Sequence, residues 1–205
     1  NLKTYFNMME EQTSRMRRII EDLLTLSTLE SKTESPDDHE INMASLLKSI
    51  QNDAIGLSQS LKKVPLQIHL QFDPTLNIRG AQDELRSAFS NLVSNAVRYT
   101  LAREDLINKP NEIFIAWSRQ NDEAVFSVRD TGIGIAPEHV DRLTERFYRV
   151  DRSRSRETGG TGLGLSIVKH ILIRHQAKLD ITSTLDVGST FSVIFPKSRV
   201  VNISQ

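Results

Sequence analysis

The sequence contains no cysteine among its 205 residues. Without thiols the chain cannot build a disulfide framework, a thiolate zinc site or a cysteine nucleophile. It also lacks an excess of charge of either sign, because 26 Lys and Arg residues balance 26 Asp and Glu residues. A dedicated nucleic-acid-binding protein normally has a basic excess, so we expect no nucleic-acid partner.

Long apolar runs are absent as well. No stretch approaches the roughly 18 residues that a membrane-spanning helix needs, and the first residues do not follow the pattern of a signal peptide. A hydrophobic content of 38% and a charged content of 25% are typical of a globular domain and exclude collagen-like or disordered chains. The length predicts one well-buried domain and an accessory element.

The first 31 residues form a candidate helix with a coiled-coil type of seam. Further apolar residues broaden the stripe beyond the seam of a two-stranded coiled coil. We expect either one helix of a bundle, which needs partner helices, or an amphipathic helix that lies on its own domain. Because the chain starts inside this helix, we expect it to be part of a longer protein. The seam residues recur at alternating steps of four and three: Leu2, Phe6, Met9, Thr13, Met16, Ile20, Leu23 and Ser27.

An acidic segment without large apolar residues, 32–40, follows this helix and predicts a linker. Residues 41–198 are expected to form the main domain, and 199–205 a C-terminal tail. Strands and helices do not alternate regularly there, so an α+β fold with helices packed on a sheet in two layers is favoured over a doubly wound sheet. The expected helices are one that Asn42 caps and that reaches Leu61, 82–99, 163–175 and a short one from Pro137. The expected strands are 66–72, 112–119, 123–130, 179–183 and 190–196.

A narrow polar stripe is expected on the helix 82–99. On a helical wheel Glu84, Asn91, Asn95 and Arg98 fall on one side, and Tyr99 borders the adjacent core face. Asn is a poor helix former, and its amide oxygen can ligate a hard cation. The stripe is compatible with a cation site. It is equally compatible with two amides that only face water.

Two glycine-containing segments are candidates for a ligand site. The first, D-T-G-I-G-I at 130–135, follows a predicted strand. Its glycines let the backbone approach a ligand closely, and Asp130 could accept a hydrogen bond from an exocyclic amine. An ordinary turn at a strand end would use the same residue types. The second, G-G-T-G-L-G-L at 159–165, leads directly into a helix, whose free N-terminal N–H groups suit phosphate.

Other phosphate-binding motifs do not fit the second segment. A Walker A loop requires a lysine where Leu165 stands, and the dinucleotide-binding pattern requires a glycine there. The motifs of eukaryotic-type protein kinases are absent. Upstream, residues 142–156 contain six arginines against two acidic residues, which leaves a net charge of +4. Beside a phosphate loop this segment favours a mobile cover over a polyphosphate, rather than a nucleic-acid arm or an ordinary solvated loop.

Taken together, five segments in chain order resemble the sequence boxes of bacterial sensor histidine kinases. They are similar to the N, G1, F, G2 and GT boxes of that family, which shares the GHKL ATPase superfamily with gyrase, Hsp90 and MutL. The F and G2 segments most resemble the phosphate-regulon branch of these kinases. The segments are N-L-V-S-N-A-V-R-Y (91–99), D-T-G-I-G-I (130–135), E-R-F-Y-R-V (145–150), G-G-T-G-L-G-L (159–165) and G-S-T-F (188–191).

The resemblance implies the Bergerat ATP-binding fold, a mixed sheet with helices on one face. Residues 1–31 would then be the second helix of a helical-bundle dimerisation and phosphotransfer domain. Asn95 is expected to ligate Mg²⁺, with Asn91 supporting the metal and the phosphates, and Asp130 to bond the adenine amino group. Arg149 is expected to contact the γ-phosphate from an ATP lid over 147–158. The remaining expected ATP contacts are Arg98, Tyr99, Gly132, Gly134, Ile135, Phe147, Tyr148, Gly160, Thr161, Gly162, Leu163, Gly164 and Thr190.

A kinase of this kind moves the γ-phosphoryl group of ATP to a histidine and then to an aspartate in the receiver domain of a response regulator. The box around that histidine is absent here. His39 and the two residues after it imitate its start, but Asn42-Met43 stands where Arg-Thr is expected. We therefore expect His39 to be a linker residue and the acceptor histidine to lie outside this sequence.

The resemblance carries four further expectations. The full protein would be a homodimer that signals phosphate starvation. This region would be cytoplasmic, and upstream segments would anchor the protein in the inner membrane.

The connection 101–111 is longer than is usual after the N box. The alternatives are a conformational ATPase of the same superfamily and a non-catalytic docking module.

Overall fold

The computed structural model describes residues 2–32, 36, 38–61, 64–103, 110–150 and 160–202. The expected lid is therefore described only up to Val150, and 104–109 of the long connection, parts of 32–40 and the last three residues of the tail lie outside the described residues. The elements are α1 (Leu2–Ser31), β1 (His39–Ile41), α2 (Met43–Leu61), β2 (Gln67–Phe72), β3 (Leu76–Gly80), α3 (Gln82–Thr100), β4 (Glu112–Gln120), β5 (Glu123–Asp130), α4 (Pro137–Val140), α6 (Gly164–Arg174), β6 (Lys178–Thr184), β7 (Gly188–Phe195), the 3₁₀ helix η1 (Lys197–Arg199) and β8 (Val200–Asn202).

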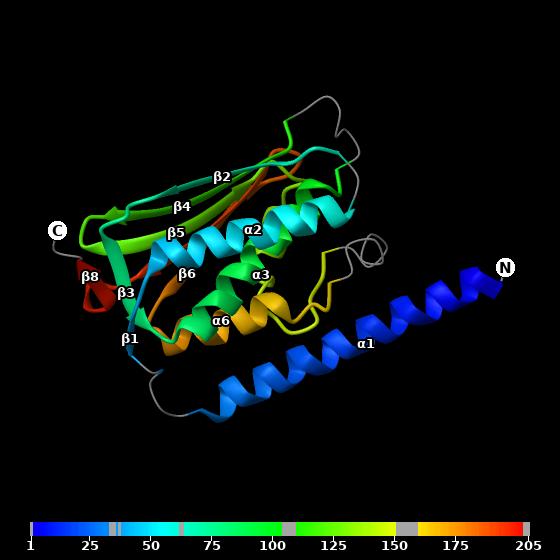
Figure 1. Ribbon diagram of the computed structural model, residues 1–205, viewed down its shortest axis with the longest axis horizontal. Coiled ribbons are helices and arrows are strands. Elements are labelled where there is room, and N and C mark those ends of the chain that lie inside the picture. The colour runs from blue at the N-terminus through cyan, green and yellow to red at the C-terminus, as the bar shows by residue number, and fades with distance from the viewer. Residues whose placement is uncertain are drawn as a thin grey trace.

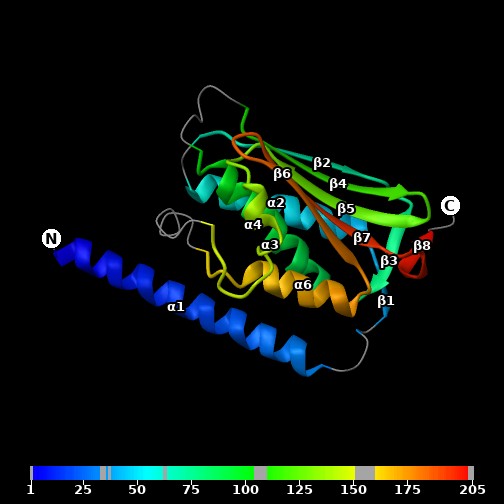
Figure 2. The same ribbon diagram turned by 180° about the vertical axis from the view of Figure 1, so that it is seen from behind.

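The main sheet has five strands in the order β2-β4-β5-β7-β6. Strand β2 runs parallel to β4, with Gln67 opposite Glu112, and the other neighbouring pairs are antiparallel. Figures 1 and 2 show α2, α3 and α6 together on one face of this sheet. The mixed sheet with helices on one face confirms the expected α+β, two-layer architecture.

Packing between the sheet and α3 decides where the polar stripe of that helix points. Phe89 of α3 stacks on Phe126 of β5 with a ring-centroid distance of 4.1 Å and meets Phe195 of β7 edge-on at 6.1 Å. All three rings are fully buried. Aromatic contacts of this size contribute strongly to core stability. They hold the apolar face of α3 on the sheet, so that its polar stripe lies at the border of the core.

A second, three-stranded sheet is not predicted by the sequence. Strand β3 lies between β1 and β8 and is antiparallel to both, with His39 opposite Gly80 and Leu76 opposite Asn202. The Trp117 indole N–H donates to the Leu76 carbonyl at 2.8 Å and so joins the two sheets. Strands of three to five residues are too short to show a clear period. Residues 39–40 of the expected linker and 200–202 of the expected tail therefore form part of the main domain.

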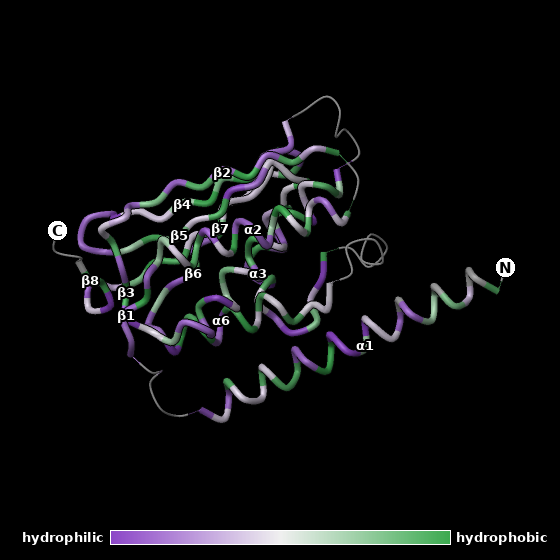
Figure 3. Tube along the Cα trace, in the orientation of Figure 1, coloured by the Kyte–Doolittle hydropathy of each residue, from purple (hydrophilic) through white to green (hydrophobic). Residues whose placement is uncertain are grey.

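Helix α1 lies along α6 on the side away from the sheet and extends beyond the domain (Figures 1 and 2). Leu26 and Leu29, close to its C-terminal end, are buried. The hydrophobic positions of α1 continue well beyond this contact (Figure 3). Within the described structure α1 thus packs on its own domain, but with a different face from the predicted seam. The large seam residues are exposed: Leu2, Phe6, Met9, Met16, Ile20 and Leu23. None of the described helices has the length and hydropathy that a membrane span requires.

Candidate functional site

The polar stripe of α3 faces the glycine-rich segment. Asn91, Asn95 and Arg98 are all half-buried. The Asn91 side-chain N–H donates to the Ser87 carbonyl at 2.9 Å, which orients the amide. Its Oδ1 lies so close to Gly164 that a Cβ there would be 2.6 Å from this oxygen. A potential metal-ligating oxygen therefore lies at the first residue of α6.

The glycine-rich segment turns sharply before it enters α6. Gly162 has a φ of +78°, and a Cβ at this position would lie 2.9 Å from the Phe147 Cα, so glycine is required. The Gly162 carbonyl accepts the Phe147 N–H at 2.8 Å, and the Thr161 hydroxyl accepts the Leu163 N–H at 3.2 Å. No described side chain caps α6 at Gly164. Its first N–H groups are therefore suited to bind an anion.

Asp130 is the buried carboxylate of the site. It ends strand β5 with an exposed fraction of 6%, and its Oδ1 accepts the Gly132 N–H at 2.8 Å. Burial raises the pKa of Asp130 to about 6, against the opposing effect of backbone hydrogen bonds from Gly132 and Ser189. A Cβ at Gly132 would lie 2.7 Å from the same oxygen and 2.8 Å from the Tyr99 carbonyl. The sequence predicted an aspartate at the end of this strand, and the structure confirms that position.

The backbone after Asp130 is held between α3 and the turn that joins β6 to β7. The Ile133 N–H donates to the Tyr99 carbonyl at 3.4 Å, and the Ile135 N–H donates to the Ser183 hydroxyl at 2.8 Å. Gly134, with a φ of +66°, packs against the end of β6. The expected contacts Tyr99, Gly132, Gly134 and Ile135 thus belong to one compact corner beside Asp130.

The F segment is ordered by contacts with α4. The Tyr148 hydroxyl and the His139 Nδ1 are hydrogen-bonded at 2.7 Å, and the Arg142 guanidinium lies over the Tyr148 ring at 4.3 Å. Phe147 has a φ of +60° and an exposed fraction of 57%. Tyr148 is therefore turned toward α4, while Phe147 is presented to the surface next to the glycine-rich segment.

Arg149 connects the F segment to the glycine-rich segment. Its guanidinium donates a hydrogen bond to the Gly160 carbonyl. Arg149 is thereby positioned next to the expected phosphate loop. The rest of the expected lid, 151–158, with three of the six arginines, lies outside the described residues.

Thr190 is not brought together with the other expected residues. In β7 the residues Phe191, Val193 and Phe195 are buried against the helices, so Thr190 points to the opposite face of the sheet. Its neighbour Ser189 is buried and donates its backbone N–H to Asp130. Ser189 is therefore the residue of this strand at the site. The alternation of large apolar residues along β7 could have shown from the sequence that Ser189, and not Thr190, shares a face with Phe191.

The long connection 101–111 is anchored at both ends to the segment after Asp130. The buried Arg103 donates hydrogen bonds to the Thr131 carbonyl and, at 2.9 Å, to the Asn111 Oδ1. The Glu112 N–H donates to the Thr131 hydroxyl at 3.0 Å. Arg103 was not among the expected site residues, because nothing in the sequence indicates which segment a loop arginine will bond.

Glu84, the first residue of the polar stripe, lies outside the site. It accepts hydrogen bonds from Arg174 at 3.0 Å and from Lys32 at 3.3 Å. Burial of the carboxyl would raise its pKa, but these two partners outweigh that effect, and the pKa of Glu84 is lowered. Arg174 also donates to the Lys32 carbonyl at 2.9 Å. Glu84 therefore attaches the end of α1 to α3 and α6.

Helix α1 reaches the glycine-rich segment. The Thr161 hydroxyl donates to the Asp22 Oδ2 at 2.6 Å, and the Arg146 guanidinium is paired with Glu30. Both contacts join residues more than 100 positions apart. No sequence pattern signals them, and they make α1 one wall of the site.

The donor chemistry fits the expected Mg²⁺. The described residues contain no cluster of three or more His, Cys, Asp or Glu side chains that could hold a metal. Mg²⁺ commonly keeps several waters and takes one or two protein oxygens together with substrate phosphates. The Asn91 amide beside the uncapped start of α6, with Asn95 one turn further along the same face of α3, matches that demand. A metal held here would depend on the nucleotide for most of its ligands.

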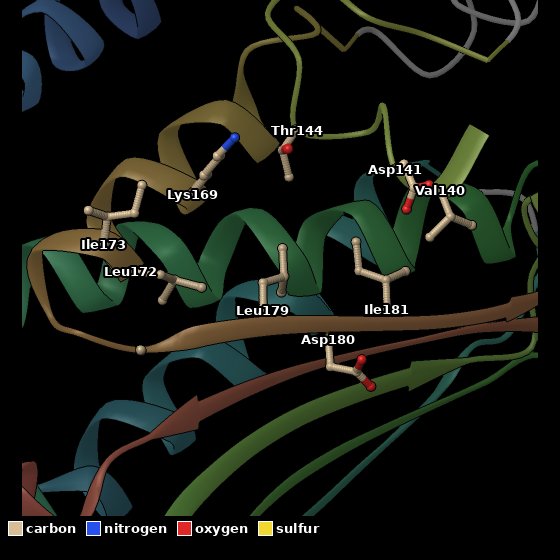
Figure 4. A pocket seen from close by; sticks show the side chains of 10 residues that line it. Val140, Asp141, Thr144, Lys169, Leu172, Ile173, Leu179, Asp180 and Ile181 are labelled. Carbon is tan, nitrogen blue, oxygen red and sulfur yellow. The ribbon is translucent and has the colours of Figure 1, made fainter. Parts of the chain in front are cut away.

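A separate cavity of about 390 Å³ lies between α4, the turn after it, α6 and β6 (Figure 4). Asp141 and Lys169 stand at its rim, and Leu172, Leu179 and Ile181 are among its apolar walls. None of the expected ATP contacts lines this cavity. The candidate site is therefore the region around α3, the end of β5 and the start of α6.

A family described as histidine kinase-, DNA gyrase B- and HSP90-like ATPase matches residues 80–199. This range is more than half of the chain. It contains α3, the end of β5, the glycine-rich segment and β7, which together form the site.

Sensor kinases are similar in sequence over most of the chain. The phosphate regulon sensor protein PhoR of Pseudomonas aeruginosa is 47% identical over 192 residues, which cover 94% of this chain and 41% of that protein. PhoR of Haemophilus influenzae is 38% identical over 196 residues, covering 95% and 43%. The chain thus spans about two fifths of the length of these relatives.

Solved structures of histidine kinases have the same fold. Full-length ShkA in complex with AMPPNP matches with a TM-score of 0.78 at 20% identity, over 99% of this chain and 40% of that chain. The Acinetobacter baumannii histidine kinase AdeS matches with a TM-score of 0.72 at 19% identity, over 95% and 84%. Both matches extend over nearly the whole chain, α1 included.

Proposed function

Because the chain belongs to the histidine kinase-, DNA gyrase B- and HSP90-like ATPase family, we propose that it is the catalytic ATP-binding region of a sensor histidine kinase. One observation carries the proposal: the Asn91 Oδ1, the uncapped start of α6 and the guanidinium of Arg149 meet around Gly160–Gly164. A metal ligand, an anion-binding helix N-terminus and a cation are what a triphosphate requires.

The base end of the nucleotide is assigned to Asp130. Its second carboxylate oxygen can accept a hydrogen bond from the exocyclic amine of adenine, while the first accepts the Gly132 N–H. Tyr99, Gly134 and Ile135 line the same corner and contact the base or ribose. A purine with a carbonyl in place of the amine would face the Asp130 carboxylate with an acceptor, so the site selects adenine over guanine.

The phosphate end is assigned to the loop and to α3. Asn95 ligates Mg²⁺ and Asn91 supports the metal and the phosphates, while Arg98 and Arg149 supply positive charge. The loop Gly160–Gly164 wraps the phosphates and offers them the uncapped N–H groups at the start of α6. Phosphoryl transfer requires the protein mainly to position the reactants and to offset charge, and these residues do both. Mg²⁺, when bound with the nucleotide, would offset charge on the phosphate oxygens.

The acceptor of the γ-phosphoryl group is a histidine on a helix outside this sequence. Asn42-Met43 departs from the acceptor box, and His39 is an exposed residue of β1 paired with Gly80. The exposed seam of α1 would pack in a helical bundle with that helix and with a second copy of the kinase. The phosphoryl group would then pass to an aspartate of a response-regulator receiver domain. Similarity to PhoR proteins supports a role in phosphate-starvation signalling.

The proposal is tested with the chain and a separately supplied helical hairpin that carries the acceptor histidine of a similar kinase. Binding of Mg-ATP is measured by calorimetry, and transfer is measured with γ-labelled ATP. We expect binding, negligible labelling of the chain itself and Mg²⁺-dependent labelling of the hairpin. Steady release of inorganic phosphate without a hairpin would instead favour a conformational ATPase, and absence of ATP binding would favour a docking module.

A further inference from the structure

One face of α1 lies over the expected phosphate loop. Asp22, which accepts the Thr161 hydroxyl, shares this face with the buried Leu26 and Leu29. On a wheel of about 100° per residue, Arg15 and Arg18 fall within about 40° of Asp22. The docked face of α1 therefore continues past Thr161 as two arginines.

The burial of these arginines agrees with the helical phase. Arg15 and Arg18 are half-buried. Arg17, between them in sequence, lies on the opposite side of the helix and is exposed. Figures 1 and 2 show α1 passing close to the start of α6. Arg15 and Arg18 are therefore partly covered on the side of α1 that faces the domain.

Two further arginines, Arg98 of α3 and Arg149, lie near Arg18 and Arg15. Burial lowers the pKa of Arg98, and the nearby Arg18 acts in the same direction against the opposing effect of Tyr99. Burial likewise lowers the pKa of Arg149, with Tyr99 opposing and Arg15 adding to the effect. Arginine carries a positive charge in proteins, so these are contacts between like charges.

We propose that Arg15 and Arg18 of α1 are ligands of the terminal phosphates of the bound nucleotide, together with Arg98 and Arg149. The inference rests on the proposed ATP site and goes beyond it, because it assigns phosphate contacts to a helix outside the family-matched range of 80–199. A polyphosphate carries several negative charges and can accept two hydrogen bonds from each guanidinium group, so it suits a place where four arginines lie close together.

The position of Asp22 accounts for the direction in which Arg15 and Arg18 point. Its hydrogen bond to Thr161 fixes the rotation of α1 about its own axis at the loop. One and two turns further toward the N-terminus, Arg18 and Arg15 then point toward Arg98 and Arg149. The opposite face of α1 carries the exposed seam. The same helix would therefore couple the phosphate end of the site to the bundle.

The test compares Arg15→Gln, Arg18→Gln and the double variant with Arg17→Gln, which removes the same charge from the exposed face. Affinities for Mg-ATP and for AMP are measured by calorimetry at one ionic strength, with circular dichroism to check the fold. We expect the double variant to bind Mg-ATP about tenfold more weakly, a loss of ~1.4 kcal/mol. Its affinity for AMP, which lacks the terminal phosphates, and both affinities of Arg17→Gln should change less than about twofold.

A second double variant separates the effect of the charges from that of the guanidinium groups themselves. Arg15→Lys with Arg18→Lys keeps both charges and should recover part of the lost ATP affinity. The inference is overturned if the double Gln variant binds Mg-ATP as tightly as Arg17→Gln does, or if AMP affinity falls in parallel. If the unaltered chain binds no Mg-ATP, the proposed function fails first. If it binds and Arg15 and Arg18 have no effect, only the present inference fails.

Discussion

At the expected base end of the site, Asp130 and Gly132 stand where a buried strand of the main sheet ends. At the phosphate end, Gly160–Gly164 and Arg149 belong to a loop that is covered by α1. The contacts of Asp130 come from Gly132 and Ser189, in the same strand end and its neighbour. The loop instead bonds Asp22, 139 positions earlier. One end is part of the folded core, and the other is assembled from separate elements.

This difference has a consequence for substitutions. A change at the base end disturbs backbone that is packed on the sheet, so it should alter the free energy of unfolding. A change at an open position of the phosphate end, such as Gly160, should alter ligand affinity with little effect on folding.

The largest difference is expected between two glycines. A Cβ at Gly134 would lie 2.0 Å from the Thr184 carbonyl oxygen, and the φ of +66° disfavours other residues. A Cβ at Gly160 would meet nothing closer than the Arg149 guanidinium at 3.6 Å. We expect Gly134→Ala to lower the free energy of unfolding by about 3 kcal/mol and Gly160→Ala by at most about 0.5 kcal/mol. Urea denaturation of both variants measures this, and equal losses would contradict the distinction.

The next effect concerns the metal ligand on α3. Asn95→Ala should reduce Mg-ATP affinity and phosphoryl transfer about 100-fold, because the amide oxygen that ligates Mg²⁺ is lost. Unfolding by urea should be unchanged, since Asn95 is only half-buried. Asn52→Ala, an exposed amide on α2, is the matched control. Transfer at the unaltered level in Asn95→Ala would refute the ligand assignment.

The pH dependence of folding should report the base end. The pKa of Asp130 is raised to about 6, above the ~3.9 of an unfolded aspartate. A raised pKa in the native state stabilises the fold fully below pH ~4, and this contribution is lost as the pH rises through 6. The loss should be roughly 2 kcal/mol. Urea unfolding between pH 4 and 7.5 measures it.

The matched variant for this measurement is Asp130→Asn, which cannot ionise. Its free energy of unfolding should change less over the same pH range, and its affinity for ATP should be about tenfold lower because the base contact is altered. Parallel pH profiles for the two proteins would show that another group is responsible.

The smallest effects are expected in β7. Ser189→Ala removes the hydroxyl that is bonded to Ser183 at 2.9 Å and leaves the backbone N–H to Asp130 in place. ATP affinity should fall two- to fivefold, or about 0.5–1 kcal/mol. Thr190→Val keeps the shape of a side chain on the opposite face and should leave ATP affinity within about twofold. A stronger loss in Thr190→Val would return Thr190 to the site.

Several features of the fold were predictable because they depend on local periodicity. The 3.6-residue period of the helix was sufficient to place Asn91, Asn95 and Arg98 on one face of α3. Alternation was sufficient to predict β2, and short apolar stretches were sufficient to predict β4 and β5. The cap of α2 was predictable too, and the Asn42 Oδ1 accepts the Ser45 N–H at 2.9 Å. Strands β1, β3 and β8 were missed because each has at most five residues and is defined by pairing with distant segments.

The sequence by itself thus determined the α+β class, the polar stripe of α3, the aspartate at the end of β5 and the glycine-rich start of α6, since each follows from residue types at short spacing. Tertiary structure decided that Ser189 and not Thr190 lies beside Asp130, that Glu84 binds Arg174, and that α1 reaches Thr161. These outcomes depend on which faces of distant elements are buried against each other. Burial is settled by the packing of the whole chain, and no local pattern encodes it.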